Sequence, residues 1–154
     1  MFEKILVCLD GSKVAEQILP YAIEEAIRFR SKLVLLQVTG AHTVPVAETG
    51  TSAIAVEAAA QQMEREQKDA KAYLDALAQQ LREKGIDAQY VLLQGLQIGQ
   101  AIVAYANENA VDLIAIATHG RSGLKRLVLG SVAEFVLRES RLPILVIRPK
   151  ERSA

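Results

Sequence analysis

Short, uninterrupted apolar runs alternate along this chain with longer segments of helical periodicity. The run Ile5–Leu9 contains no polar residue, which is typical of a strand that is covered on both faces of a sheet. Strands that alternate with helices predict a parallel sheet with helices on both faces and right-handed crossovers. We therefore expect a single doubly wound α/β domain with a five-stranded parallel sheet. The predicted strands are 5–9, 32–39, 89–93, 113–117 and 144–147.

Apolar residues at helical spacing predict a helix in each connection between these strands. Pro20 lies inside the first helix and should kink or restart it, and Ser12 is placed to cap it. Ser131 and Glu134 have the spacing of a capping box at the start of the last helix. Residues 40–53 show no clear period and are predicted to form a long loop, a type of segment that is often functional. The predicted helices cover 14–29, 56–84, 98–108 and a segment that opens at Gly130-Ser131.

Composition and charge narrow the class of protein. The chain has 154 residues, of which 51% are hydrophobic, enough for the core of one domain, predicted over 1–150 with a tail at 151–154. The formal net charge is zero, so neither nucleic acid nor an anionic membrane is an expected partner. No apolar run approaches the length of a membrane span, and the start of the chain does not read as a signal peptide, so we expect a cytoplasmic protein. Cys8, the single cysteine, lies in an apolar run and is predicted to be a buried, inert thiol.

A basic loop that contains glycines follows the strand 113–117 and leads into the last helix. Glycine lets a backbone come close to a ligand, and the first amides of a helix carry partial positive charge. Together with basic side chains, these features favour a phosphate pocket. Turns and a helix cap alone would explain the same residues equally well, and the pattern does not separate the two interpretations. The residues concerned are Gly120, Arg121, Gly123, Lys125, Arg126, Gly130 and Ser131.

The segment ATHGRSGLKRLVLGSVAEFVL resembles the signature of the universal stress protein family. The nucleotide-binding branch of that family has Gly, two residues, Gly, nine residues, and then Gly-Ser or Gly-Thr. Gly120 and Gly130-Ser131 match this spacing, whereas Ala117 stands at the first glycine position and adds a methyl group to the predicted pocket. The resemblance extends over nearly the whole chain, from MFEKILVCLDGS at the start to PILVIRP near the end.

This resemblance implies the strand order 3-2-1-4-5, with strands 1 and 4 side by side and their helices on opposite faces. Ligands of such sheets bind outside the carboxyl ends of the strands at this switch point. Asp10 ends strand 1 and Thr118 follows strand 4, so these two stretches are expected to meet at one crevice.

The resemblance also implies a ligand and its contacts. The ligand would be ATP, or AMP or ADP, with Mg²⁺ held through the phosphates rather than by protein ligands. Asp10 would lie near the ribose, and the backbone of Val38 would hydrogen-bond the adenine. Plainer alternatives are a solvated turn for Asp10, strand core for Val38 and a local hydrogen bond for His119. The implied nucleotide-binding residues are Asp10, Gly11, Ser12, Val38, Ala117, His119, Gly120, Arg121, Gly123, Gly130, Ser131 and Val132.

Three functions are compatible with these residues. The first is a regulatory protein of the stress response that binds ATP. The second is a slow ATPase that uses the same site; it is weaker because the sequence shows no catalytic triad and places no carboxylate pair in the crevice. The third is an interaction module without nucleotide, favoured if Ala117 blocks the pocket. His42, His119 and Cys8 do not form a convincing metal set, and no P-loop or strand-linked GxGxxG occurs.

The last strand predicts how copies of the chain associate. In the implied order, strands 3 and 5 are the edges of the sheet, and Ile144–Ile147 is a run of four apolar residues. Both faces of this edge strand are then apolar, which invites pairing with another chain. We expect a homodimer through 144–148, with the two copies antiparallel, and the resembling family commonly dimerises in this way. A monomer whose last strand is covered by its own helices and tail is the alternative.

Overall fold

A computed structural model describes residues 1–40, 52–118 and 129–150 of the chain. Strands and helices alternate as the sequence predicts, and the bounds of β4, β5 and α3 agree with the prediction. The elements in chain order are β1 (Lys4–Leu9), the 3-10 helix η1 (Ala15–Ile18), α1 (Leu19–Phe29), β2 (Lys32–Gly40), α2 (Ala53–Glu83), β3 (Ala88–Gly95), α3 (Ile98–Glu108), β4 (Leu113–Ala117), α4 (Ser131–Glu139) and β5 (Ile144–Ile147).

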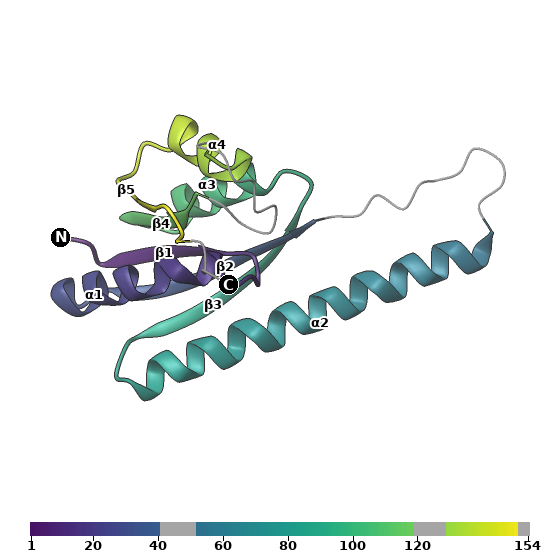
Figure 1. The fold of residues 1–154 in the computed structure, drawn as a ribbon, viewed down its shortest axis with the longest axis horizontal. Coiled ribbons are helices and arrows are strands. Elements are labelled where there is room, and N and C mark those ends of the chain that lie inside the picture. Colours follow the sequence, from purple (N-terminus) through teal and green to yellow (C-terminus); the bar gives the residue numbers. More distant parts are fainter. Residues whose placement is uncertain (41–51, 119–128, 151–154) are drawn as a thin grey trace.

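The five strands form one parallel sheet in the order β3-β2-β1-β4-β5. The predicted fold class and strand order are therefore confirmed. In the central strand, Ile5 pairs with Leu33 of β2 on one side and with Leu113 of β4 on the other. The order reverses between β1 and β4, so their carboxyl ends form the switch point of the sheet (Figure 1).

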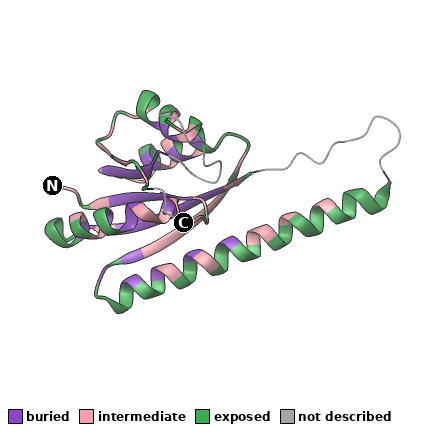
Figure 2. Ribbon diagram, viewed as in Figure 1, coloured by how far each residue is buried: buried purple, intermediate pink, exposed green. Residues whose placement is uncertain are grey.

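Helices cover both faces of the sheet, which explains why the central strands are apolar throughout. Successive residues of β1 pack on opposite sides: Ile5 and Val7 lie in the core under α1 and α2, and Leu6 and Cys8 lie in the core under α3 and α4. The buried residues follow the central strands and the inward stripes of the helices (Figure 2). The helix after β1 and the helix after β4 thus lie on opposite faces, as expected.

Local sequence signals account for most of the helix boundaries. Pro20 sits in the first turn of α1, directly after η1, so the predicted restart is confirmed. Ser12 Oγ accepts a hydrogen bond from the Ala15 amide at 3.1 Å, at the start of η1. Ser52 caps α2 by accepting from the Ala55 amide at 3.3 Å, which explains why this helix begins three residues before the predicted Val56.

The predicted capping box at the start of α4 is wrong. Gly130 is the N-cap residue, with φ −54° and ψ 148°, and Ser131 is already the first helical residue, without a side-chain cap. A serine inside the first turn no longer has the extended backbone that aims its hydroxyl at the third helical amide. The backbone supplies the contact instead, since the Glu134 amide donates to the Gly130 carbonyl oxygen at 2.9 Å.

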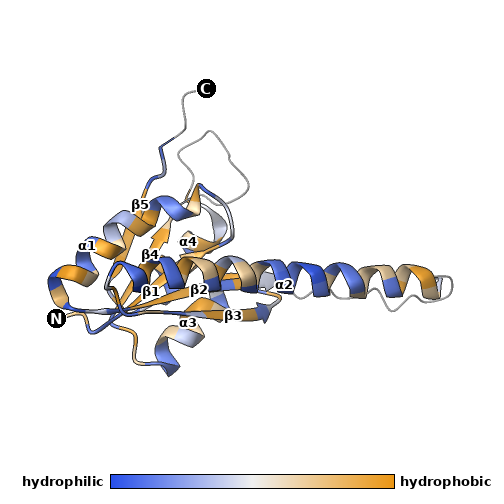
Figure 3. Cartoon of the chain, turned by 90° about the horizontal axis from the view of Figure 1, so that it is seen from below, coloured by the Kyte–Doolittle hydropathy of each residue, from blue (hydrophilic) through white to orange (hydrophobic). Residues whose placement is uncertain are grey.

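The buried residues of the 31-residue helix α2, namely Ala70, Leu74, Ala78 and Leu81, all lie in its C-terminal half. The N-terminal part extends past the sheet and is mostly exposed (Figures 1 and 3). Among the helices that the structure describes, none has the length and apolar content needed to cross a membrane.

Candidate functional site

A cleft with a volume of about 610 Å³ opens at the carboxyl ends of β1, β2 and β4. Its walls come from both faces of the sheet, because α2 lines one side and α3 and the start of α4 line the other. Seven of the predicted nucleotide-binding residues line it, and they come from four separate parts of the chain. These are Asp10, Gly11, Val38, Ala117, Gly130, Ser131 and Val132.

The other predicted residues fall into two groups. Ser12 contributes through Asp10, as described below. His119, Gly120, Arg121 and Gly123 lie outside the described residues. The cleft therefore brings together the end of β1, the end of β2 and the two ends of the segment that leads from β4 to α4.

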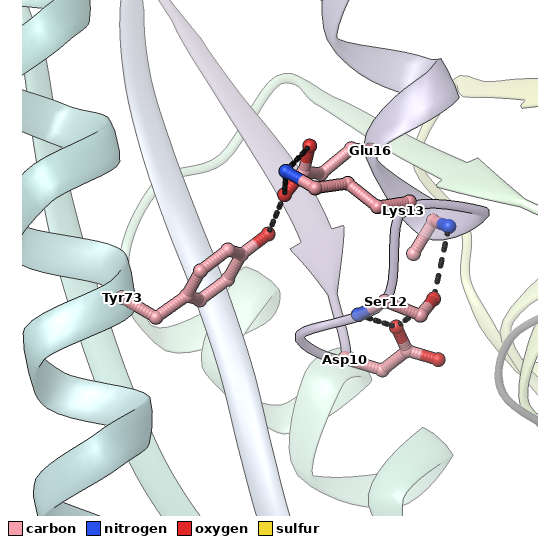
Figure 4. Close-up of polar contacts among 6 residues, drawn as sticks. Asp10, Ser12, Lys13, Glu16 and Tyr73 are labelled. Atoms are coloured by element: carbon pink, nitrogen blue, oxygen red, sulfur yellow. Dashed lines mark hydrogen bonds and ion pairs between the residues drawn. The ribbon is translucent and has the colours of Figure 1, made fainter.

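A tight turn fixes Asp10 at the end of β1 (Figure 4). Its Oδ1 atom accepts hydrogen bonds from the Ser12 amide at 2.9 Å and from the Ser12 hydroxyl at 2.5 Å. Gly11 has a φ of +83°, a left-handed conformation that favours glycine. The Asp-Gly-Ser sequence thus holds a carboxylate group in a defined orientation at the cleft.

The start of α4 forms the opposite wall. The Gly130 amide donates to the Thr118 carbonyl oxygen at 2.7 Å, and the Thr118 amide donates to the Ile147 carbonyl oxygen at 2.9 Å. These bonds hold the N-terminus of α4 beside the ends of β4 and β5. The first amides of a helix have no partner within the helix and carry partial positive charge, so this wall suits an anionic group.

Apolar side chains line the α3 side of the cleft. Ile98 and Ile102 of α3 face the ends of β2 and β4, where Val38 and Ile116 are buried. A flat, uncharged ring would bury apolar area against such a wall. Ala117 also lines the cleft and is buried, and a volume of about 610 Å³ remains beside its methyl group. The methyl group at the first glycine position therefore does not close the cleft.

Helix α2 supplies a polar wall that the sequence analysis did not predict. Glu66, Asp69 and Tyr73 lie on one stripe of this helix, with Ala70 between them. The expectation that no carboxylate pair lies in the crevice is wrong, because α2 brings Glu66 and Asp69 to it. Side chains three or four positions apart share a helix face, so their spacing was a signal, but the sequence does not show what that face contacts.

Tyr73 joins this wall to the segment after β1 (Figure 4). Its Oη atom donates to Glu16 Oε1 at 2.9 Å, and Glu16 also pairs with Lys13, whose Nζ lies 3.0 Å from Oε2. Burial, and then the hydrogen bond to Glu16 and the charges of Glu16 and Asp10, raise the pKa of the Tyr73 phenol above its usual value. The phenol is thus a hydrogen-bond donor at neutral pH.

Cys8 lines the cleft as a buried cysteine. Its side chain is 7% exposed, and burial raises the pKa of the thiol from 9.0 to about 12. A protonated, buried thiol is a poor nucleophile and a poor metal ligand. The predicted burial of Cys8 is confirmed. Within the described part of the chain, no group of three or more His, Cys, Asp or Glu residues could hold a metal ion.

Comparisons with known proteins identify the family. Residues 1–148 match the universal stress protein family. The universal stress protein YxiE of Bacillus subtilis is 31% identical over 150 residues, which cover 96% of this chain and 100% of YxiE. The structure of the universal stress protein UspA from Lactobacillus plantarum superposes with a TM-score of 0.79 at 21% identity, over 96% of this chain and 98% of UspA.

A second similar structure holds a ligand. The universal stress protein from Archaeoglobus fulgidus, solved in complex with dAMP, has a TM-score of 0.63 at 20% identity and covers 96% of this chain and 98% of its own. At this identity the similarity shows the fold. The family match over 148 residues and the identity to YxiE along its full length go further: the chain belongs to the universal stress protein family.

Proposed function

We propose that this protein binds an adenine nucleotide in the cleft at the switch point of the sheet, as a regulatory protein of the stress response. ATP is the proposed ligand, with AMP and ADP as alternatives. The observation that carries the proposal is that a fixed carboxylate, an apolar wall and a helix N-terminus line one cleft. These three surfaces suit a sugar, a base and a phosphate chain in turn. The dAMP complex of the Archaeoglobus fulgidus relative supports the ligand class.

Each part of the nucleotide has a proposed partner. Asp10 accepts hydrogen bonds from the ribose hydroxyls, and the Val38 backbone bonds the edge of the adenine, whose ring packs against the α3 side. The phosphates lie against Gly130 and are held by the Ser131 and Val132 amides, since the Gly130 amide already donates to the Thr118 carbonyl oxygen. His119, Gly120, Arg121 and Gly123, which lie outside the described residues, are proposed to complete the phosphate site. Mg²⁺ would be held through the phosphates, whose oxygens are ligands that it prefers.

Slow ATP hydrolysis is the second candidate, and one observation favours it. Asp69 and Glu66 line the cleft from α2, and an ionised carboxylate can orient or deprotonate a water molecule. Incubation with ATP over hours, with detection of released phosphate, separates hydrolysis from binding alone. A wild-type rate above that of an Asp69→Asn variant would support hydrolysis, and equal background rates would leave binding as the function.

The proposed ligand can be identified without adding one. Protein purified gently and then denatured releases any retained small molecule for mass spectrometry, and we expect an adenine nucleotide at up to one per chain. Titration calorimetry with ATP then covers the case of a ligand lost during purification. Absence of a retained nucleotide together with absence of binding heat would contradict the proposal and favour an interaction module.

We also propose that the protein is a homodimer through β5. This strand is an edge of the sheet, and Ile144, Leu145, Val146 and Ile147 are all only partly buried although they are apolar. Successive side chains of an edge strand point to opposite faces of the sheet. Pairing with a second copy would therefore bring neighbours to the side chains on both faces at once. A two-fold axis would make the two β5 strands antiparallel and would join the two sheets into one.

A further inference from the structure

Gln37 is a polar residue in the apolar part of β2. The run from Leu33 to Val38 is otherwise apolar, and every residue in it is buried. Gln37 is 6% exposed and pairs in the sheet with Leu9 of β1 and Leu92 of β3. Strand alternation places its side chain on the α1 and α2 side, as for Leu33 and Leu35, which belong to the core under these helices.

The Gln37 side chain carries a buried acceptor that lacks a partner. Its Oε1 atom has no hydrogen-bond partner among the described residues. Buried polar atoms are nearly always hydrogen-bonded, because an unpaired one destabilises the folded state. An apolar side chain of the same length at this position would avoid this loss of stability. Gln37 also lines the cleft, and a rotation of its terminal amide would turn this oxygen, which is closed to water in the structure, toward a ligand there.

Neighbouring groups favour a ligand that donates hydrogen bonds. The Thr39 hydroxyl already accepts from Gln67 Nε2 at 2.6 Å and donates to the Leu93 carbonyl oxygen at 3.2 Å. The carboxylates of Glu66 and Asp69, when ionised, only accept hydrogen bonds. The α2 side of the cleft is therefore rich in acceptors. A hydroxyl or an amino group suits direct contact with these side chains, whereas a phosphate in direct contact with the carboxylates would be repelled.

We propose that Gln37 contacts the bound nucleotide and that its Oε1 atom accepts a hydrogen bond from an amino or hydroxyl group of the nucleoside. This inference rests on the proposed function and adds a specificity-determining side chain to it. Val38 follows directly in β2 and points to the opposite face, so the end of this strand contacts the nucleoside with the Val38 backbone and the Gln37 side chain. An analogue that lacks the donor leaves Oε1 unpaired and binds more weakly.

Gln37→Met separates this role from a structural one, because methionine has a similar length and no acceptor. The ligand-free variant is expected to melt at the same temperature as the wild type or higher, since it no longer buries an unpaired oxygen. Its affinity for ATP is expected to fall about threefold to tenfold, the range of one neutral hydrogen bond. Gln17→Met is the matched control. Its amide pairs with the Lys150 backbone at 3.0 and 2.8 Å, so its loss should lower the melting temperature and leave affinity unchanged.

Nucleotide analogues identify the donor. Wild type and Gln37→Met are each titrated with ATP, 2′-deoxy-ATP, 3′-deoxy-ATP and the triphosphate of purine riboside, which lacks the amino group. For the group that bonds Gln37, the wild type loses about threefold to tenfold in affinity and the variant loses almost nothing more. Coupling to the amino group assigns Gln37 to the base, and coupling to a hydroxyl assigns it to the sugar.

Two binding results would overturn the inference while leaving nucleotide binding in place. One is a wild type that binds ATP and a Gln37→Met protein that binds it equally well. The other is that, for each of the three analogues, the loss of affinity caused by the analogue and the loss caused by Gln37→Met simply add. A Gln37→Met protein that melts below the wild type would also overturn it, because the side chain would then be part of the fold. A wild type that binds no nucleotide would remove the proposed function and this inference together.

Discussion

Tyr73 of α2 donates a hydrogen bond to Glu16 of η1, with 2.9 Å between Oη and Oε1, although the two residues are 57 positions apart in the sequence. This bond links the long helix that lines one wall of the cleft to the segment that follows Asp10. Glu16 is held in turn by Lys13. The arrangement fixes α2 relative to β1 at the edge of the sheet where the cleft opens.

Replacing Tyr73 by Phe should lower the free energy of unfolding by about 1 kcal/mol at neutral pH, the net contribution of one hydrogen bond. The folded pKa of Tyr73 is raised above its unfolded value of 10.0, first by burial and then by Glu16. Its contribution to stability is therefore complete below pH 10 and is lost as the pH rises through the folded pKa.

Chemical denaturation of wild type and Tyr73→Phe at a series of pH values from 7 upward measures this term. The wild type should lose stability more steeply than the variant at alkaline pH. Tyr21→Phe is the control, because Tyr21 is 52% exposed. Equal alkaline slopes for wild type and Tyr73→Phe would show that the phenol has no raised pKa.

Gly99 permits close packing of α3 against α4. A Cβ atom at this position would lie 2.8 Å from Cδ1 of Phe135 and 3.0 Å from its Cβ. Gly99→Ala should therefore destabilise the protein by about 1–3 kcal/mol, the usual effect of overpacking. Gly40→Ala is the matched control, since a Cβ there meets nothing within 4 Å.

Thermal unfolding measures the stability of both glycine variants. A smaller side chain at the contact with Gly99 should restore part of the stability that Gly99→Ala loses. Gly99→Ala combined with Phe135→Leu should regain part of the lost stability, because leucine leaves room for the added methyl group. A Gly99→Ala protein as stable as the wild type would mean that the two helices can separate without loss.

The parts of the fold that the sequence predicts best are those where one physical reason acts alone. An apolar run such as Leu113–Ala117 is stable as a strand covered on both faces, and the strand ends where the apolar residues end. The predicted bounds of β4 therefore agree with the structure. The meeting of Asp10 with the start of α4 followed from the implied strand order, because parallel strands end at one edge. Strand order alone therefore locates the residues that follow a strand, and no side-chain contact has to be known.

Other features depend on packing that no local pattern reports. The stripe of Glu66 and Asp69 is visible in the sequence, but only the docking of α2 places it at the cleft. Gln37 reads as one polar residue in an apolar strand, and its unpaired oxygen emerges only from its surroundings. The Ser131–Glu134 spacing is the same whether the serine lies before the helix or inside it, and Gly130 takes the cap position.

Asp10→Ala should weaken the binding of adenosine as well as of ATP, because the proposed contact is with the ribose. A hydrogen bond to a charged group contributes about 1.5–3 kcal/mol. Calorimetric titration with both ligands measures the loss. If only ATP with Mg²⁺ bound more weakly, Asp10 would act through the metal instead of the sugar.

Asp112→Ala provides the control for this experiment. Asp112 Oδ2 accepts from the Glu3 and Lys4 amides at 2.9 Å each, at the opposite end of β1. Its loss should lower the melting temperature without changing either affinity, which separates a general loss of stability from a contact in the cleft.

Val146→Lys should convert the proposed dimer into a monomer, because it places a charge in the centre of β5. Light scattering gives the mass of wild type and variant, and circular dichroism reports whether the variant is folded. Val91→Lys is the control, a partly buried valine on the other edge strand. A monomeric wild type at high micromolar concentration would refute the dimer, and a folded dimer of Val146→Lys would move the interface elsewhere.

Titration of ATP into nucleotide-free wild type and into Gly130→Val, with circular dichroism on both, tests nucleotide binding in the cleft most directly. Gly130 lines the cleft at the N-cap of α4 with φ −54°, a value that valine can adopt, so the fold should persist. The added side chain would occupy the space proposed for the phosphates. We predict saturable binding at one site per chain for the wild type and none for the folded variant. A wild type without binding, or a folded Gly130→Val with wild-type affinity, would contradict the account.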